Sequence, residues 1–146
     1  MPAPEQEPLG LHLARTAKAA SRAFDDALAA AGGSLPQWLI LVELKGRTHG
    51  TQRTIAGAVG VEGPTLTHHL NKMEAAGLVT RQRDPNNRRV HQVALTEAGE
   101  AKFASLLTTV VAFDQRLRRD LDERDLTRLH RLLDRLLANV TTEPKP

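Results

Sequence analysis

Short polar and basic side chains recur along one predicted helix in the middle of this 146-residue sequence. Leu66, Leu70 and Met73 are spaced i, i+4 and i+7, so they share one apolar face and are expected to point into a core. The other sides carry hydroxyl, imidazole, amide and ammonium groups, which can bind base edges and phosphates in a DNA groove. A solvated amphipathic helix is the plainer alternative. The predicted DNA-binding residues of this helix are Thr65, Thr67, His68, Asn71 and Lys72, with His69 on the flank.

A cluster of arginines lies further along the chain, in and around a polar segment that contains Pro85 and two consecutive asparagines. Proline and asparagine mark a turn, so residues 83–89 are expected to join two short strands, 79–82 and 90–95. A narrow minor groove has an enhanced negative potential that attracts inserted arginine side chains. A solvated basic turn is the alternative. The predicted DNA-binding residues of this hairpin are Arg81, Arg83, Asn87, Arg88 and Arg89.

Local signals predict two short helices before this hairpin. Thr51 can cap a first helix over residues 53–59, and Gly60 has the backbone freedom that a tight turn needs. Pro64 suits the first turn of the second helix, and Gly77 is expected to end it. The order helix, turn, helix, β-hairpin is typical of a winged helix-turn-helix, whose second helix enters the major groove. The expected fold class is therefore mostly α with a small β-hairpin wing (α+β).

The charge of the chain is concentrated in this region. The formal net charge is +3, yet residues 47–95 contain seven Lys/Arg and three Asp/Glu, a net charge of +4, which leaves −1 for the rest. Binding to a phosphate backbone releases counterions and requires basic charge on the binding side. Only three Phe and one Trp are present, which disfavours a single-stranded partner stacked on aromatic rings. The expected partner is double-stranded DNA.

The central segment resembles the MarR family of bacterial transcription regulators. The resemblance implies a homodimer that binds a pseudo-palindromic operator as a repressor. It also implies that Arg89 corresponds to the arginine that enters the minor groove in the family. The family usually has an acidic residue at the position of Asn87 and an arginine at that of His68, so Asn87 cannot form the salt bridge that orients the arginine. The likeness is carried by the sequences PTLT (64–67), MEAAGLV (73–79), RDP (83–85), RR (88–89) and LTEAG (95–99).

Amphipathic helices are predicted on both sides of the DNA-binding region. Residues 9–31 carry an apolar stripe at helical spacing, and residues 97–140 hold two further helices, the last with leucines at alternating spacings of three and four. Such a surface exceeds what a small winged domain buries, so 9–31 and 97–140 are expected to form a symmetric dimer interface. Packing within one chain is the alternative.

The whole chain, residues 1–146, is expected to be one domain whose DNA-binding region covers residues 35–95. Its first helix, residues 35–45, is predicted to begin with a capping box formed by Ser34 and Gln37. That helix is apolar on most sides and is expected to lie buried.

A small-molecule effector follows only from the resemblance. In the family, small phenolic or aromatic carboxylates bind in a crevice between the dimer helices and the winged domain and release the DNA. The candidates are His12, Arg15, Trp38 and His49, which combine aromatic surface with donors suited to a carboxylate. Core packing of Trp38 and a salt bridge of Arg15 are the alternatives.

Other functional classes find little support in the sequence. The absence of cysteine excludes thiol redox sensing, and the six histidines lack the helical spacing of paired metal ligands, His68 and His69 being expected to point apart. Neither a metal nor another cofactor is expected, and no catalytic motif indicates an enzyme. No apolar run approaches the length of a membrane span, and no signal-peptide pattern is present, which favours the cytoplasm. A winged-helix interaction module without operator recognition and a metal-responsive regulator stay as alternatives.

Overall fold

Helices predominate in the computed structural model, which describes residues 6–46 and 50–142. The chain divides into two units, one ending at Phe113 and one beginning at Asp114, so the fifth helix crosses the division. The predicted fold class, mostly α with a small β-sheet, is confirmed. The described elements are α1 (Leu9–Ala30), α2 (Leu35–Lys45), β1 (Gly50–Thr51), α3 (Gln52–Val59), α4 (Gly63–Ala75), β2 (Val79–Arg83), β3 (His91–Leu95), α5 (Glu97–Leu117) and α6 (Glu123–Thr141).

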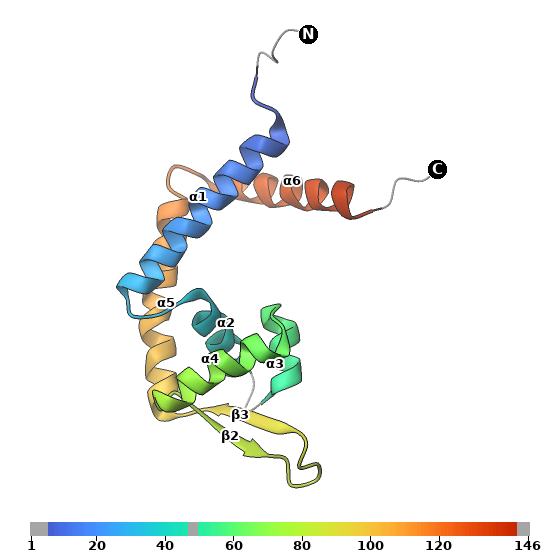
Figure 1. The fold of residues 1–146 in the computed structure, drawn as a ribbon. Helices are drawn as coiled ribbons and strands as arrows, with labels where there is room; N and C mark the ends of the chain where they lie inside the picture. Colours follow the sequence, from blue (N-terminus) through green and yellow to red (C-terminus); the bar gives the residue numbers. More distant parts are fainter. Residues whose placement is uncertain (1–5, 47–49, 143–146) are drawn as a thin grey trace. The chain divides into compact units, whose positions relative to one another are not determined.

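The strands form one antiparallel sheet in the order β1-β3-β2. Figure 1 shows β2 and β3 side by side. β2 and β3 pair along their full length, from Val79 opposite Leu95 to Arg83 opposite His91, which is the predicted hairpin. The sequence predicts no strand at β1, whose two residues pair with the other edge of β3. A strand of two residues is too short to show the alternation by which strands are predicted.

The predicted turns of the helix-turn-helix are present. Thr51 Oγ1 accepts a hydrogen bond from the Thr54 amide at 3.2 Å and so caps α3. Gly60 follows α3 with a φ of 77°, a conformation that favours glycine. After α4, Gly77 (φ 75°) and Leu78 donate their amides to carbonyls of the last helical turn, which is the Schellman arrangement. These caps define the ends of α3 and α4.

The predicted capping box of α2 is only half formed. Ser34 Oγ accepts from the Gln37 amide at 3.3 Å. The Gln37 side chain makes no return bond, and its buried Oε1 has no hydrogen-bond partner among the described residues. The expectation that α2 is buried holds for Trp38 but not for Leu39 and Val42, which are exposed.

An apolar core stabilises the unit that ends at Phe113. The indole of Trp38 stacks on the ring of Phe103 with centroids 5.3 Å apart, which joins α2 to α5. The predicted apolar face of α4 lies in this core, so the opposite side of α4 is left for solvent. The buried side chains are Leu28, Trp38, Ile40, Leu41, Leu44, Ile55, Leu66, Leu70, Met73, Leu78, Val79, Val93 and Leu106.

A close backbone contact joins the start of α5 to the chain before β2. Thr96 caps α5 as predicted, because its Oγ1 accepts from the Gly99 amide at 3.0 Å. A Cβ at position 99 would lie 2.1 Å from the carbonyl oxygen of Leu78. Only glycine therefore permits this approach, which holds the hairpin against α5.

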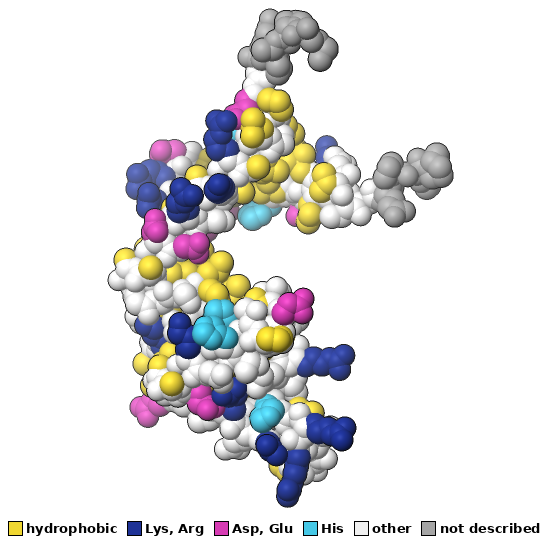
Figure 2. All heavy atoms as spheres, viewed as in Figure 1, with side chains coloured by type: hydrophobic (Ala, Val, Ile, Leu, Met, Phe, Trp, Pro, Cys, Tyr) yellow, Lys and Arg dark blue, Asp and Glu magenta, His cyan; other side chains and the backbone are white. Residues whose placement is uncertain are grey.

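The unit that begins at Asp114 contains the end of α5 and all of α6. Asp122 and Asp125 form a reciprocal capping box at the start of α6, with N–H···O distances of 2.8 and 3.1 Å. No residue of α6 is buried in this single chain. Figure 2 shows hydrophobic side chains on the surface of α6, and they include Leu129, Leu132, Leu133, Leu137 and Val140.

None of the described helices alone is long and apolar enough to cross a membrane. α1 and α2 reach that length and apolarity only when they are counted together, and they are bent by 79° at the break between them. α2 also contributes four side chains to the core.

Candidate nucleic-acid interface

α4 turns most of the predicted DNA-binding side chains toward solvent. Thr67 and His69 are half-buried, and the Thr67 hydroxyl donates to the Gly63 carbonyl at 3.1 Å. That bond lies within α4, so Thr67 is partly committed to its own helix. The exposed members of the set are Thr65, His68, Asn71 and Lys72.

The two histidines of α4 contact each other. Their rings meet edge to face with centroids 5.7 Å apart, whereas the sequence predicted that they would point apart. Burial lowers the pKa of His69, and the charges of His68 and Lys72 lower it further. His69 is therefore held toward its neutral form near pH 7. Within residues 6–46 and 50–142, no three histidine or carboxylate side chains gather in a way that could hold a metal ion.

The wing presents arginine side chains to solvent. Arg83, Arg88 and Arg89 are all exposed, and Figure 2 shows Lys and Arg side chains gathered over the β2–β3 hairpin. No hydrogen bond or ion pair joins these three side chains to the described part of the chain. Their guanidinium groups are therefore available to an anionic partner.

Two short polar side chains shape the tip of the wing. Asn87 Oδ1 accepts from the backbone amide of Arg89 at 3.2 Å, and Asp84 Oδ1 accepts from that of Asn86 at 2.8 Å. Both are local turns of the kind that Asn and Asp favour. Asp84 also accepts from the Gln92 side chain at 2.9 Å, which joins the turn to β3. Asn87 thus holds the backbone of Arg89 and not its guanidinium.

Arg81 differs from the other arginines of the hairpin. Its side chain is only 18% exposed, and its Nε donates to Glu74 Oε2 at 2.9 Å. Its Nη2 donates to Asn71 Oδ1, and Asn71 lies on α4 together with Glu74. The hydrogen bond from Arg81 lowers the pKa of the Glu74 carboxyl. The structure therefore brings two predicted DNA-binding residues, Arg81 and Asn71, into contact with each other, and it adds Glu74, which the sequence did not single out.

A groove of about 520 Å³ separates the helix-turn-helix from the hairpin. Arg81 and Glu74 lie in this groove, with Arg83 and His91 on the strand side. It is lined by Gln52, Thr67, Glu74, Arg81, Arg83 and His91.

The three predicted effector-binding residues that the structure describes lie in different surroundings. Arg15 is exposed and pairs with Glu7 at 2.6 Å, as one of the alternatives anticipated. Trp38 is 8% exposed and packs in the core, which was also the alternative. His12 is exposed on α1, and His49 lies outside the described residues.

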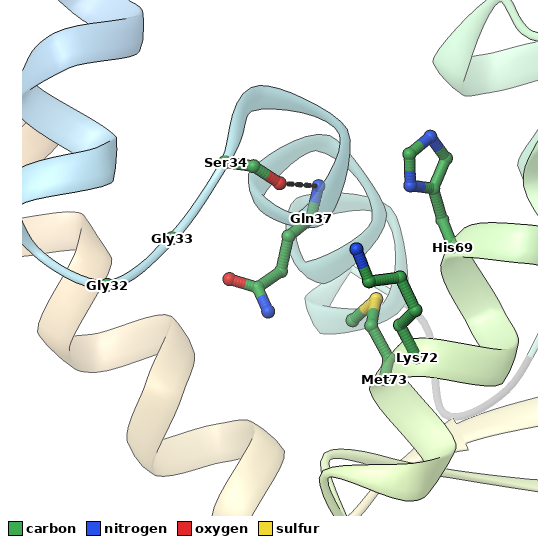
Figure 3. A pocket seen from close by; sticks show the side chains of 7 residues that line it. All are labelled: Gly32, Gly33, Ser34, Gln37, His69, Lys72 and Met73. Atoms are coloured by element: carbon green, nitrogen blue, oxygen red, sulfur yellow. Dashed lines mark hydrogen bonds between the residues drawn. The ribbon is translucent and has the colours of Figure 1, made fainter.

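A different cavity, of about 300 Å³, lies between α2, the turn before it, and α4. In Figure 3, His69 and Lys72 extend from α4 into the space in front of α2, and Met73 approaches Gln37. His12, Arg15 and Trp38 do not line this cavity. No short sequence pattern could have found it, because its walls come from segments more than thirty positions apart, Gly32, Gly33, Ser34 and Gln37 on one side and His69, Lys72 and Met73 on the other.

The arrangement of α3, α4 and the arginine-bearing hairpin matches a known family. The sequence model of the MarR family matches residues 34–91, which include α2, α3, α4, β2 and the turn that follows β2. This part of the chain is therefore similar to the MarR family.

Solved structures with the MarR-family fold resemble this chain over most of its length. The transcriptional regulator PA4135 is 27% identical with a TM-score of 0.74, covering 97% of this chain and 100% of its own. The transcriptional repressor CouR, solved bound to a 23-mer DNA duplex, is 27% identical with a TM-score of 0.79, covering 89% of this chain and 92% of its own. A mutant MarR from E. coli, solved with operator DNA, has a TM-score of 0.78 at 24% identity, covering 89% of this chain and 94% of its own.

These comparisons confirm the predicted MarR resemblance and the winged helix-turn-helix fold. The chain has the fold of a MarR-family transcriptional regulator, and the family and its solved members are regulators and not enzymes.

Proposed function

We propose that this MarR-family protein is a transcriptional repressor that acts in the cytoplasm and binds a pseudo-palindromic operator as a homodimer. One observation carries the proposal: the exposed polar side of α4 lies beside a hairpin with three exposed arginines that have no partner among the described residues. A helix with short polar side chains suits the major groove, and unpaired arginines suit the minor groove and phosphates. The DNA-bound structure of CouR supports the same mode of binding.

The proposed contacts divide between the helix and the wing. On α4, Thr65, His68 and Lys72 reach bases and phosphates of the major groove, with Thr67 and His69 at the edge of this surface. The wing contacts are Arg83, Arg88 and Arg89, with Asn87 holding the backbone from which Arg89 extends.

A salt titration with an operator fragment from upstream of the protein's own gene tests this proposal. Each phosphate contact that is lost lowers the slope of log K against log salt by about 0.9. We expect Arg89→Ala to weaken binding and to reduce the slope by that amount. Arg22→Ala is the matched control, because Arg22 is an exposed arginine of α1 outside the proposed interface. Operator binding no tighter than binding to random DNA would favour an interaction module that does not read sequence.

The homodimer is proposed from the apolar surface of α6. Leu133 is 38% exposed and Leu137 is 60% exposed in the single chain, and exposed leucines recur along the helix. Contiguous apolar surface of this kind marks an interface in a folded protein. A second copy that covers it with the same face gives a twofold dimer, whose recognition helices would read half-sites about ten base pairs apart. Sedimentation equilibrium gives the mass directly, and a monomer at micromolar concentration would contradict the dimer.

We also propose that a small aromatic carboxylate relieves repression from the cavity between α2 and α4. A volume of about 300 Å³ suits a small ligand, and Lys72 supplies a cation beside the apolar Met73. The test compares how salicylate, as the probe, releases operator DNA from the wild type and from Gln37→Leu, a variant outside the DNA-facing side. We expect the variant to bind DNA normally but to need more salicylate. An equal response of both proteins would place the effector elsewhere.

A further inference from the structure

We propose that Arg81 is a positioning residue that fixes the wing against the recognition helix and does not itself bind DNA. The inference rests on one part of the proposed function, namely that the recognition helix and the wing contact DNA at the same time. It gives Arg81 and Asn71 a different role from the exposed residues around them.

The contact has the geometry of a clamp between two elements. Asn71 and Glu74 are three residues apart on α4, so their side chains stand one turn apart on the same side of the helix. Arg81 on β2 donates from Nε to Glu74 and from Nη2 to Asn71, and a second contact of 3.4 Å runs from Nη2 to Glu74 Oε1. The planar guanidinium fork has several donors in a fixed arrangement, which a single ammonium group cannot reproduce. The three side chains therefore restrict both distance and angle.

Burial separates Arg81 from the arginines proposed to bind DNA. It lies opposite Val93, a fully buried residue of β3, and it shares its side of β2 with the buried Val79. Its side chain is 18% exposed, while Arg83, two residues further along the same strand, is exposed and has no partner among the described residues. A phosphate would have to displace Glu74 and Asn71 before it could bind the Arg81 guanidinium. Arg81 and Arg83 lie on the same strand, yet Arg81 positions the wing and Arg83 is free to bind DNA.

The clamp crosses the groove that separates α4 from the hairpin. Arg81 and Glu74 both line this groove, so their bond sets the separation of its two walls. The chain between α4 and β2 turns at Gly77, a flexible residue type. The bonds from Arg81 to Glu74 and Asn71 join the elements on either side of this turn. A wing held in position before binding avoids part of the ordering cost of association. Loss of the clamp should therefore weaken DNA binding although no DNA contact is lost.

Glu74→Ala distinguishes a clamp from a DNA contact at Arg81, because the two roles predict opposite changes in operator affinity. If Arg81 is a DNA contact, removal of the Glu74 carboxylate frees a cation and removes a negative charge near DNA, so binding tightens. If Arg81 is a clamp, the same substitution releases the wing and weakens binding, by about twofold to fivefold for a partly exposed pair. Glu62→Ala is the matched control: Glu62 is an exposed carboxylate at the other end of α4 with no side-chain cap bond.

The expected results form one pattern. Glu74→Ala and Arg81→Ala weaken operator binding to a similar extent, their effects are not additive, and the salt slope stays that of the wild type. Glu62→Ala leaves binding unchanged or tighter. The exchanged pair Arg81→Glu with Glu74→Arg recovers part of the lost affinity, which a general loss of stability would not explain.

Hydrogen exchange without DNA tests the clamp independently of the proposed function. Faster exchange of the β2 amides in Arg81→Ala, with α1 amides unchanged, supports the clamp even if the wild type binds no operator. The proposal is overturned if Glu74→Ala tightens binding, if Arg81→Ala lowers the salt slope as Arg89→Ala does, or if β2 exchange is unchanged.

Discussion

The winged helix-turn-helix and α6 are both amphipathic, but they differ in what covers their apolar sides. α4 buries Leu66, Leu70 and Met73 in the core of its own unit, and only its polar side is free. α6 has no buried residue and exposes leucines along its length. The first region is therefore stabilised by burial within its own chain, whereas the apolar side of α6 is left uncovered in the single chain.

The same difference separates two kinds of function. A recognition surface needs side chains that are free because others are buried beneath them, as on α4. The oligomerisation surface that we propose needs apolar side chains that one chain leaves uncovered, and α6 has them. The predictions that follow test whether the two regions respond as differently as their burial implies.

The largest effect is expected from charge placed in the apolar face of α6. Leu133→Glu combined with Leu137→Glu should convert the proposed dimer into a monomer, because two carboxylates would be buried in the interface. Operator affinity should then fall by about 10²-fold or more, since both half-sites no longer bind together. Sedimentation and operator titration measure the two effects. Thr127→Glu, on the polar side of α6, is the control, and a variant that stays dimeric would place the interface elsewhere.

A core truncation in α4 should lower stability to the same extent at every protein concentration. Leu70 is fully buried, so Leu70→Ala should cost about 2–5 kcal/mol in the free energy of unfolding. Leu129→Ala, at a 45% exposed position of α6, should lower the melting temperature only as far as it weakens association. Thermal melts across a hundredfold range of concentration distinguish the two. Identical concentration dependence would remove the contrast between the regions.

The contact between Gly99 and Leu78 tests how rigidly the hairpin is held to α5. Gly99→Ala should destabilise the protein by about 1–3 kcal/mol, because the new methyl group would overlap the Leu78 carbonyl at 2.1 Å. Gly57→Ala is the control in α3, where a Cβ meets nothing within 4 Å and helix propensity improves. Urea denaturation gives both free energies. Equal effects of the two substitutions would mean that the α5 start shifts without cost.

The smallest effect concerns pH. The pKa of His69 lies below its ordinary 6.5 in the folded protein, so the side chain is mainly neutral at pH 7.5. DNA phosphates favour the protonated ring, so binding should take up protons, and affinity should rise about twofold to threefold per unit as pH falls from 8 to 6. Without DNA the sign reverses: the unfolded chain protonates first, so stability falls as pH drops through 6.5.

Operator titrations at several pH values check this prediction. His69→Gln should flatten the pH profile of affinity, and His130→Gln on α6 should leave it unchanged. A profile that His69→Gln does not alter would remove His69 from the DNA-facing surface.

Much of the winged region could be predicted because its signals are local. The Thr51 cap, Gly60, Pro64 and Gly77 each act on the backbone within a few residues. In the structure, α3 and α4 begin and end within two residues of these positions. The strand β1 was missed because pairing and not composition makes two residues a strand. The effector prediction grouped His12, Arg15 and Trp38 by chemistry alone, and the structure places them in different surroundings.

The sequence alone determined the order of the helices and of the hairpin, the polar side of α4, and the arginine-rich turn, since periodicity and turn residues act over short distances along the chain. Only the tertiary structure decided which of those polar groups are free. Arg81 and Arg83 have the same chemistry and neighbouring places on one strand, yet one is held by Glu74 and the other is exposed. That outcome depends on how α4 packs against β2, because a hydrogen bond between separate elements requires a distance and an angle that no local pattern specifies.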